Sequence, residues 1–435
     1  LFLLGFFLDF IEIAVVVVPI VAPILLANPE ANITAVWFGV MVGLNIQTSF
    51  LTPPFGFALF YLRGVADKIV KTLDIYKGAV AFIGLQLMGL AIAGLYPSLV
   101  NYLPLRTHLT SDTSPPPINP KLQACLEDYV DTAYSENSEA FSQALSAARQ
   151  IDSSLLEPEL AVKLADSITM VEKSPLLLGE LVAAKAAIDD YVPEYKPVQN
   201  EVRRLEADTR RIQATILKRE DDIKLTRDEE KIAALNAGIE ELRSEEADLQ
   251  QRIPAEWPAV SEQFKTLNGD MIKARRNYQN NVDTAYMQLA EIEAILAGTE
   301  DAASLAAPLG ALGAPVKSGE IEATMAQIKE VESMISSMTG LSKVKSLLSK
   351  ARRALKKGEE KRPQAIEHYQ QAAELYAQNI AWRKAAASQI LPALSTFKSS
   401  LNETVGIRSQ KKLTVEQAKY VARCQSTHKD ISIYF

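Results

Sequence analysis

The chain contains few of the residues from which metal and redox centres are built. Its 435 residues include two cysteines and three histidines. Cys125 and Cys424 do not have the spacing of a zinc or redox motif, and the histidines are scattered. The two cysteines could pair in an oxidising compartment if the ends of their region meet, but we expect two ordinary buried thiols. No nucleophile–base pair or phosphate-binding loop stands out, so the sequence predicts neither an enzyme nor a bound cofactor.

Charge is scarce in the first quarter of the chain. Residues 1–104 hold five acidic and four basic residues, whereas residues 105–435 hold 48 and 42. The first part is apolar enough to lie in a lipid bilayer, and the second is typical of a water-soluble chain. The sequence begins at Leu1 without an initiator methionine and without the pattern of a signal peptide. We therefore expect more membrane sequence upstream.

The most informative segment of the membrane part runs from Asn45 to Gly56. It places Pro53 and Pro54 beside amide and hydroxyl side chains, within the apolar stretch 34–62. The two prolines cannot continue the helix before them, so carbonyl groups there lose their intrahelical partners. At membrane depth this is tolerated where the freed groups line a cavity or hold an ion. We expect a broken helix with a polar site; the alternative is a proline kink that serves packing alone.

Two more membrane elements flank this break. Residues 1–26 are interrupted by Asp9 and Glu12, which favours a re-entrant hairpin with its tip at these carboxylates over a simple span. The carboxylates are either functional or cap a helix at the interface. Residues 78–100 predict an ordinary span. All four bases of this part lie between Arg63 and Lys77. The positive-inside rule places that loop in the cytoplasm and residues 105–435 outside.

Three of these segments together resemble one family. They are Gly5-Phe6-Phe7-Leu8-Asp9 with its apolar run to Pro23, Trp37-Phe38-Gly39-Val40-Met41 leading to Leu51-Thr52-Pro53-Pro54-Phe55-Gly56, and Arg63-Gly64-Val65-Ala66. Together they are similar to the second re-entrant hairpin and the following broken helix of the large permease subunit of tripartite ATP-independent periplasmic (TRAP) transporters. The resemblance covers residues 1–103.

The resemblance implies an elevator-type, sodium-coupled importer in the bacterial inner membrane. Its partners would be a small membrane subunit and a periplasmic binding protein that delivers an organic acid, whose identity the sequence does not set. Sodium would lie between the hairpin tip and the helix break. Hydroxyl, amide and freed carbonyl oxygens suit that ion, so the candidate sodium site comprises Asn45, Thr48, Ser49, Thr52 and Gly56. Candidate substrate contacts are Asp9, Gln47, Pro53 and Pro54.

The remainder of the chain predicts helices. A proline-rich linker (105–120) leads to a helical region (121–297), a second linker rich in Ala, Gly and Pro (298–319) and a last helical region (320–435). We expect helices at 120–150, 158–173, 176–191, 258–297, 320–357, 363–400 and 413–425. The fold class is therefore all-α: a re-entrant hairpin, a broken helix and a final span, followed by a soluble helical bundle.

Residues 198–253 carry the clearest apolar periodicity. The three-four spacing of apolar residues reaches Ile223 and resumes out of phase at Ile232, with Arg219 as an irregular member. Thr226-Arg227-Asp228-Glu229 has the form of a capping box at that slip. We expect an antiparallel coiled-coil hairpin that turns near 224–228; the alternative is one long coiled coil with a phase defect.

Two functional hypotheses follow. The first is a carrier with a helical appendage of unassigned role on the periplasmic side, which could dock the binding protein. The second is a membrane-anchored scaffold in which the polar break is dispensable. The basic stretch Lys343 to Arg362 is either a solvated helix face or a contact for anionic lipid or an acidic partner. The acidic balance of the chain argues against nucleic acid.

Overall fold

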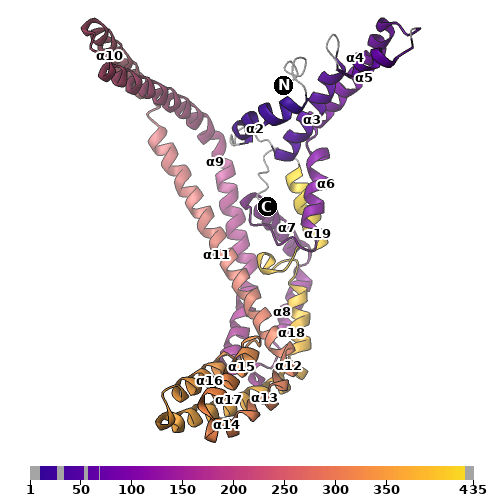
Figure 1. Cartoon of the computed structure of the whole chain (residues 1–435), viewed down its shortest axis with the longest axis vertical. Helices are drawn as coiled ribbons and strands as arrows, with labels where there is room; N and C mark the ends of the chain where they lie inside the picture. Colours follow the sequence, from indigo (N-terminus) through magenta and orange to yellow (C-terminus); the bar gives the residue numbers. More distant parts are fainter. Residues whose placement is uncertain (1–9, 27–33, 53–56, 68, 427–435) are drawn as a thin grey trace. The chain divides into compact units, whose positions relative to one another are not determined.

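The computed structural model describes residues 10–26, 34–52, 57–67 and 69–426 (Figure 1). In these ranges every regular element is a helix and none is a strand, which confirms the all-α class. The chain divides into two compact units, Leu1–Val171 with Asp283–Phe435 and Glu172–Val282. The division cuts through two long helices, α9 (Pro158–Leu225) and α11 (Trp257–Ala297).

The membrane-like part begins with one helical stretch. It comprises α1 (Phe10–Glu12), a π-helical turn (Ile13–Val17) and α2 (Val18–Leu26). Glu12 therefore lies within a helix, where the sequence predicts part of a hairpin tip. Asp9 and the first arm of that hairpin lie outside the described residues. The broken helix follows as α3 (Ala35–Leu51) and α4 (Phe57–Val65).

The final span is α5 (Thr72–Leu95), which begins earlier and ends earlier than predicted. Among the described residues it is the one helix long and apolar enough to cross a membrane. Only 11% of an apolar 18-residue stretch of this helix is buried, whereas the core helix of a soluble protein is mostly buried. It ends where Tyr96 leaves the helical region (φ −120°) before Pro97, because a proline disfavours helical dihedrals in the residue before it. Another helix, α6 (Ser98–Leu109), follows at once.

Residues 110–119 contain no helix, so the proline-rich linker is shorter than the predicted 105–120, because α6 extends to Leu109 and α7 begins at Pro120. Asn119 ends it by accepting a hydrogen bond from the backbone N–H of Lys121 (2.9 Å), which caps α7 (Pro120–Glu136). The helix predicted over 120–150 is divided at Asn137 into α7 and α8 (Ser138–Ala148). The C-terminal helix α19 (Val415–Ser426) packs against both α6 and α7.

The single helix α9 replaces the separate helices predicted before residue 225. Pro175, Pro193 and Pro197 all lie inside it, although each removes a backbone donor. Burial of apolar side chains along the helix compensates for these losses: Leu178 and Leu181 are at most 1% exposed, and Val202 is 1% exposed. The prolines are therefore absorbed by packing on either side of them.

The hairpin predicted near 224–228 is confirmed, which excludes the single long coiled coil. Helix α9 ends at Leu225, and α10 (Glu229–Gln251) returns along it with Leu205, Ile212 and Ile239 in their shared core. The cap is Asp228, which accepts from the N–H groups of Glu230 and Lys231, rather than Thr226. Arg219 occupies a position of the apolar pattern and lies over Gly238 of α10. A Cβ atom at residue 238 would be 2.3 Å from Nη1 of Arg219, so the glycine leaves room for the arginine side chain.

The predicted linker 298–319 is wrong, since it folds as three short helices. These are α12 (Thr299–Ser304), α13 (Ala306–Ala311) and α14 (Gly313–Ser318). They share a core with α15 (Ile321–Ser336), α16 (Ser342–Leu355) and α17 (Arg362–Gln389). The helix predicted over 320–357 is divided into α15 and α16. The helix predicted over 363–400 is divided into α17 and α18 (Leu391–Ser400).

Candidate functional site

Four of the five candidate sodium ligands share one face at the end of α3. Asn45, Thr48, Ser49 and Thr52 are separated by three, one and three residues, a spacing that places their Cα atoms on one face of a helix. Gln47 lies off that face and is exposed. Helix α3 ends at Leu51, one residue before Thr52. Pro53, Pro54 and Gly56, like Asp9, lie outside the described residues, so their predicted roles stay predictions.

Two threonine hydroxyls on this face are engaged with the helix itself. Thr48, which is fully buried, donates its hydroxyl proton to the carbonyl of Leu44 (2.8 Å). Thr52 donates to the carbonyl of Thr48 (2.7 Å) and so caps the last turn of α3. A hydroxyl that donates its proton still has two oxygen lone pairs, and a carbonyl oxygen has a second one. The geometry therefore presents oxygen acceptors at the end of the helix.

This donor set fits a hard cation better than a transition metal. Hydroxyl, amide and carbonyl oxygens are the ligands that such cations take. No group of three or more His, Cys, Asp and Glu side chains within the described ranges could hold a metal ion. The residues present thus suit sodium.

A second polar contact, which the sequence analysis missed, fastens the start of α3. Thr34 is 1% exposed and donates its hydroxyl proton to Oδ1 of Asn101 on α6 (2.9 Å), while it accepts from the N–H of Trp37 (2.9 Å). The indole N–H of Trp37 donates to the carbonyl of Ala93 on α5 (2.9 Å). The signal available in the sequence was a threonine at the N-cap of an apolar helix. These contacts fix the helix that leads to the break.

Cys125 on α7 and Cys424 on α19 form a disulfide across a sequence separation of 299 residues. The expectation of two separate thiols is therefore wrong. One turn away on each helix, the rings of Tyr129 and Tyr420 meet edge to face at 5.3 Å. The hydroxyl of Tyr129 donates to Glu403 (2.6 Å), and burial together with this carboxylate raises the pKa of Tyr129. The disulfide and the tyrosine pair join α7, soon after the membrane part, to the last described helix.

The comparisons with known proteins concern the membrane part. Residues 1–99 match the family model of the tripartite ATP-independent periplasmic transporter, DctM component. Sialic acid TRAP transporter permease protein SiaT of Haemophilus influenzae is 33% identical over 104 residues, which cover 24% of this chain and 16% of that protein. C4-dicarboxylate TRAP transporter large permease protein DctM of Vibrio cholerae is 30% identical over 100 residues, which cover 23% of this chain and 21% of that protein.

A third relative matches over the same length of chain. Isethionate TRAP transporter permease protein DctMQ of Oleidesulfovibrio alaskensis is 31% identical over 99 residues, which cover 23% of this chain and 15% of that protein. The chain thus spans less than a quarter of the length of each of these relatives. No solved structure matches the chain.

Proposed function

We propose that this chain, whose residues 1–99 are a large-permease region of the TRAP family, supplies helices of a sodium-coupled importer of organic acids. The observation that carries the proposal is the end of α3 at Leu51, inside the matched region and beside a face of oxygen-bearing side chains. The relatives are named for sialic acid, C4-dicarboxylates and isethionate, all of which are organic anions. The partners would be a small membrane subunit and a periplasmic binding protein.

In this proposal the broken helix holds the coupling ion. Sodium would be bound by lone pairs of Thr48, Thr52 and the backbone carbonyls that the break frees. Thr52 would position the last turn of α3 through its bond to the Thr48 carbonyl and offer its own oxygen to the ion. Asn45 would add an amide oxygen from the same face, and the upstream part of the permease would complete the coordination and the substrate pocket.

The disulfide supports a periplasmic position for the helical region. Disulfides persist in oxidising compartments such as the bacterial periplasm and are rare in the cytosol. The charge distribution argues for the same side, because three of the four bases of the membrane part lie before α5 and the fourth, Lys77, lies near its start. In this orientation the protein is a multi-pass protein of the inner membrane, with residues 105–435 on the side where a binding protein delivers substrate.

The test is a pair of threonine substitutions in the complete permease with its partners. Thr107 on α6 makes the same hydroxyl bond to its own helix (to the carbonyl of Leu103, 2.9 Å) as Thr52 does, but it is exposed and lies away from the break. Thr52→Val is expected to raise the sodium concentration for half-maximal uptake by roughly tenfold, since it removes an oxygen ligand. Thr107→Val should leave uptake unchanged.

A membrane-anchored scaffold is the competing function. The observation that favours it is the single membrane-length helix among the described residues, α5. One helix long enough to span a bilayer suffices as an anchor for a helical region. The scaffold requires no ion at the break, so Thr52→Val and Asn45→Leu would then leave sodium binding and uptake unaffected. Equal sodium dependence of Thr52→Val and Thr107→Val would therefore reject an ion site at the break.

The helical region would help to dock the binding protein. Its unit Glu172–Val282 is one continuous segment, and the hydrogen bond from Ser167 on α9 to Gln288 on α11 (2.8 Å) lies outside it. Replacing residues 172–282 with a short turn should raise the concentration of binding protein needed for half-maximal uptake. If both this concentration and the maximal uptake stay the same, the unit has no docking role.

A further inference from the structure

Positive charge is concentrated along helix α16 and in the residues that follow it. Residues 343–362 hold nine of the 46 lysine and arginine residues of the chain and two of its 53 acidic residues. An even distribution would place about two bases in a segment of this length. Helix α16 itself contains no acidic residue. The segment is therefore strongly basic within a chain whose net charge is −7.

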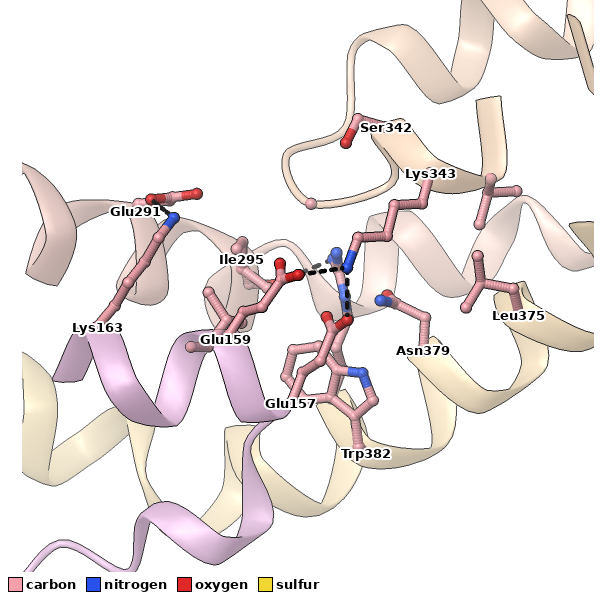
Figure 2. Close-up of a pocket in the computed structure, with 14 residues that line it drawn as sticks. Glu157, Glu159, Lys163, Glu291, Ile295, Ser342, Lys343, Leu375, Asn379 and Trp382 are labelled. Carbon is pink, nitrogen blue, oxygen red and sulfur yellow. Dashed lines mark hydrogen bonds and ion pairs between the residues drawn. The ribbon is translucent and has the colours of Figure 1, made fainter. Parts of the chain in front are cut away.

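Three of the nine bases form ion pairs with acidic side chains of the helical region. These pairs are Lys343 with Glu157 and Glu159, Arg352 with Glu332, and Arg362 with Glu359. Figure 2 shows the Lys343 side chain reaching toward the carboxylates of Glu157 and Glu159. The charges of these three bases are therefore balanced within the fold.

The other six bases are exposed and form no ion pair among the described residues. They are Lys345, Lys350, Arg353, Lys356, Lys357 and Lys361. Glu360 is the second acidic residue of the segment, and it is exposed as well. Six bases against one acid leave the surface of the segment with an excess of positive charge.

The neighbouring helices do not neutralise this excess. On α15, Glu332 is already paired with Arg352 (3.2 Å). On α17, Glu367 and Glu374 accept hydrogen bonds from Gln371 and Gln378 of their own helix (3.3 Å each). The six bases are thus left to solvent or to a partner outside the chain.

Five of these bases lie on one side of α16 and its C-terminal end. At 3.6 residues per turn they fall within an arc of about 140°; they are Lys345, Lys350, Arg353, Lys356 and Lys357. The opposite side of the helix is apolar and packs against α15 and α17 (Figure 1), with Val344, Leu348, Ala351 and Leu355 buried. We call the five bases the basic face.

The fold alone does not account for the whole basic face. Lys356 and Lys357 follow the last turn of α16, where a positive charge is favourable because of the helix dipole. Lys345 and Lys350 lie before that turn and gain nothing from it. Lys350, Arg353 and Lys357 are three and four residues apart, so their like charges repel one another. An anionic partner would relieve this repulsion.

We infer that the basic face binds the anionic headgroups of a phospholipid bilayer. Clusters of about four to eight lysine and arginine residues on an amphipathic helix are typical of proteins that bind such surfaces. The ammonium group of lysine is a point charge on a flexible chain, which suits many dispersed phosphates. The chain also carries α5, which is long and apolar enough to cross a membrane.

The composition of α16 favours lipid over an acidic protein as the partner. Four of the five residues of the basic face are lysine, which is depleted in protein–protein interfaces. Such interfaces are enriched in aromatic residues and methionine, and α16 contains neither. Its apolar side is already buried in the core, so binding would depend on charge alone. This surface is independent of the sodium site and of the proposed transport.

The test is sedimentation of the full chain, held in nanodiscs of neutral phosphatidylcholine, with sucrose-loaded vesicles. The vesicles contain about 30% phosphatidylglycerol or phosphatidylcholine alone. At about 0.05 M salt we expect at least roughly tenfold stronger binding to the anionic vesicles, and at about 0.5 M salt no preference, because salt screens exposed charges. Equal binding to both kinds of vesicle at low salt, or a preference that persists at high salt, would overturn the inference.

A matched pair of triple variants separates the basic face from the net charge of the chain. Lys350→Glu, Arg353→Glu and Lys357→Glu together should weaken binding to the anionic vesicles by at least roughly tenfold. The control reverses three exposed bases elsewhere, with Lys173→Glu, Lys218→Glu and Arg227→Glu. It changes the net charge by the same amount and should bind within about twofold of the unchanged protein. An equal loss in both variants would contradict the assigned surface.

Amine labelling of the unchanged protein gives a readout that needs no substitution. An amine-reactive reagent should modify Lys350 and Lys357 several-fold more slowly when the anionic vesicles are bound, because the headgroups cover them. Lys173 and Lys218 are exposed on α9 and should react at the same rate with and without vesicles. Unchanged labelling of Lys350 and Lys357 in the bound protein would show that the lipid binds elsewhere and would overturn the inference.

Discussion

Apolar side chains lie in opposite environments in the permease-like part and in the helical region. On α4 and α5 of the permease-like part they are exposed, whereas on α16 and α17 of the helical region they are buried. Phe60 and Leu95 are 75% and 76% exposed, whereas Leu348 and Ala372 are fully buried. Exposed apolar surface on this scale is typical of a lipid-facing helix. The same chain therefore carries one part that exposes large apolar side chains and another that packs them into a core.

The two parts also differ in the contacts that hold their helices together. The described contacts between the permease-like helices include polar bonds such as Thr34 to Asn101, a kind of contact that contributes to helix association in lipid. The helical region has a packed core and a disulfide. Helix α6 belongs to both arrangements, because it contacts α3 and α19.

The largest expected effect on stability comes from removing the disulfide, which is described only in the helical region. Replacing Cys125 and Cys424 with serine removes a cross-link between residues 299 positions apart. In the chain-entropy description this costs about 5 kcal/mol. Thermal unfolding of the full chain should show a lower midpoint for the helical region, and dithiothreitol should lower the unchanged protein to the same value. Equal unfolding midpoints of the oxidised protein and the double variant would show that the disulfide does not stabilise the helical region.

A matched pair of leucines compares the two environments directly. Leu348 is fully buried in the core of the helical region, and Leu85 on α5 is 60% exposed. Leu348→Ala should cost about 3 kcal/mol through lost contacts and a cavity. Leu85→Ala should cost less than about 1 kcal/mol, because lipid or detergent refills the space. Urea unfolding in detergent measures both, and similar losses would show that α5 is packed like a soluble core helix.

The smallest expected effect is a pH dependence in the helical region. Burial alone would raise the pKa of Glu293, but hydrogen bonds from Lys398 (2.5 Å) and Ser395 (2.7 Å) lower it overall. A lowered pKa stabilises the fold above the ordinary glutamate value of 4.5. That stability is lost as the pH falls through the lower value in the folded state.

Glu293→Gln should therefore reduce stability by about 1–2 kcal/mol at pH 7 and by less as the pH falls below about 4.5. Glu330→Gln, at an exposed position of α15, is the control and should show no such difference. Unfolding midpoints at several pH values measure the effect. A loss in Glu293→Gln that does not depend on pH would mean that the charge of this carboxylate does not stabilise the fold.

The comparison also explains which features the sequence could predict. The hairpin turn after Leu225 was predictable because a phase slip and a capping residue are local signals. The pairing of Cys125 with Cys424 was not, because it depends on α7 and α19 meeting in the folded chain. Pro193 and Pro197 inside α9 and the helices at 298–319 were missed for one reason: burial, such as that of fully buried Ala302 and Val316, outweighs an unfavourable local composition.

The candidate site was predictable in part. The double proline predicted the end of α3, and the resemblance supplied the residues around it. The Thr34–Asn101 bond was not predictable, since it joins residues 67 positions apart. Nor was the burial of Arg383 on α17 predictable, because a guanidinium on a helix ordinarily faces solvent, whereas this residue is 1% exposed.

The central claim is that the break after α3 holds the coupling ion, and sodium-dependent uptake tests it most directly. The complete permease and its partners would be reconstituted in liposomes, and organic acid uptake would be measured over a range of sodium concentrations at constant membrane potential. We expect saturable dependence of uptake on sodium, no uptake when choline replaces sodium, and a roughly tenfold higher sodium concentration for half-maximal uptake in Thr52→Val. Equal uptake in choline and in sodium would contradict it.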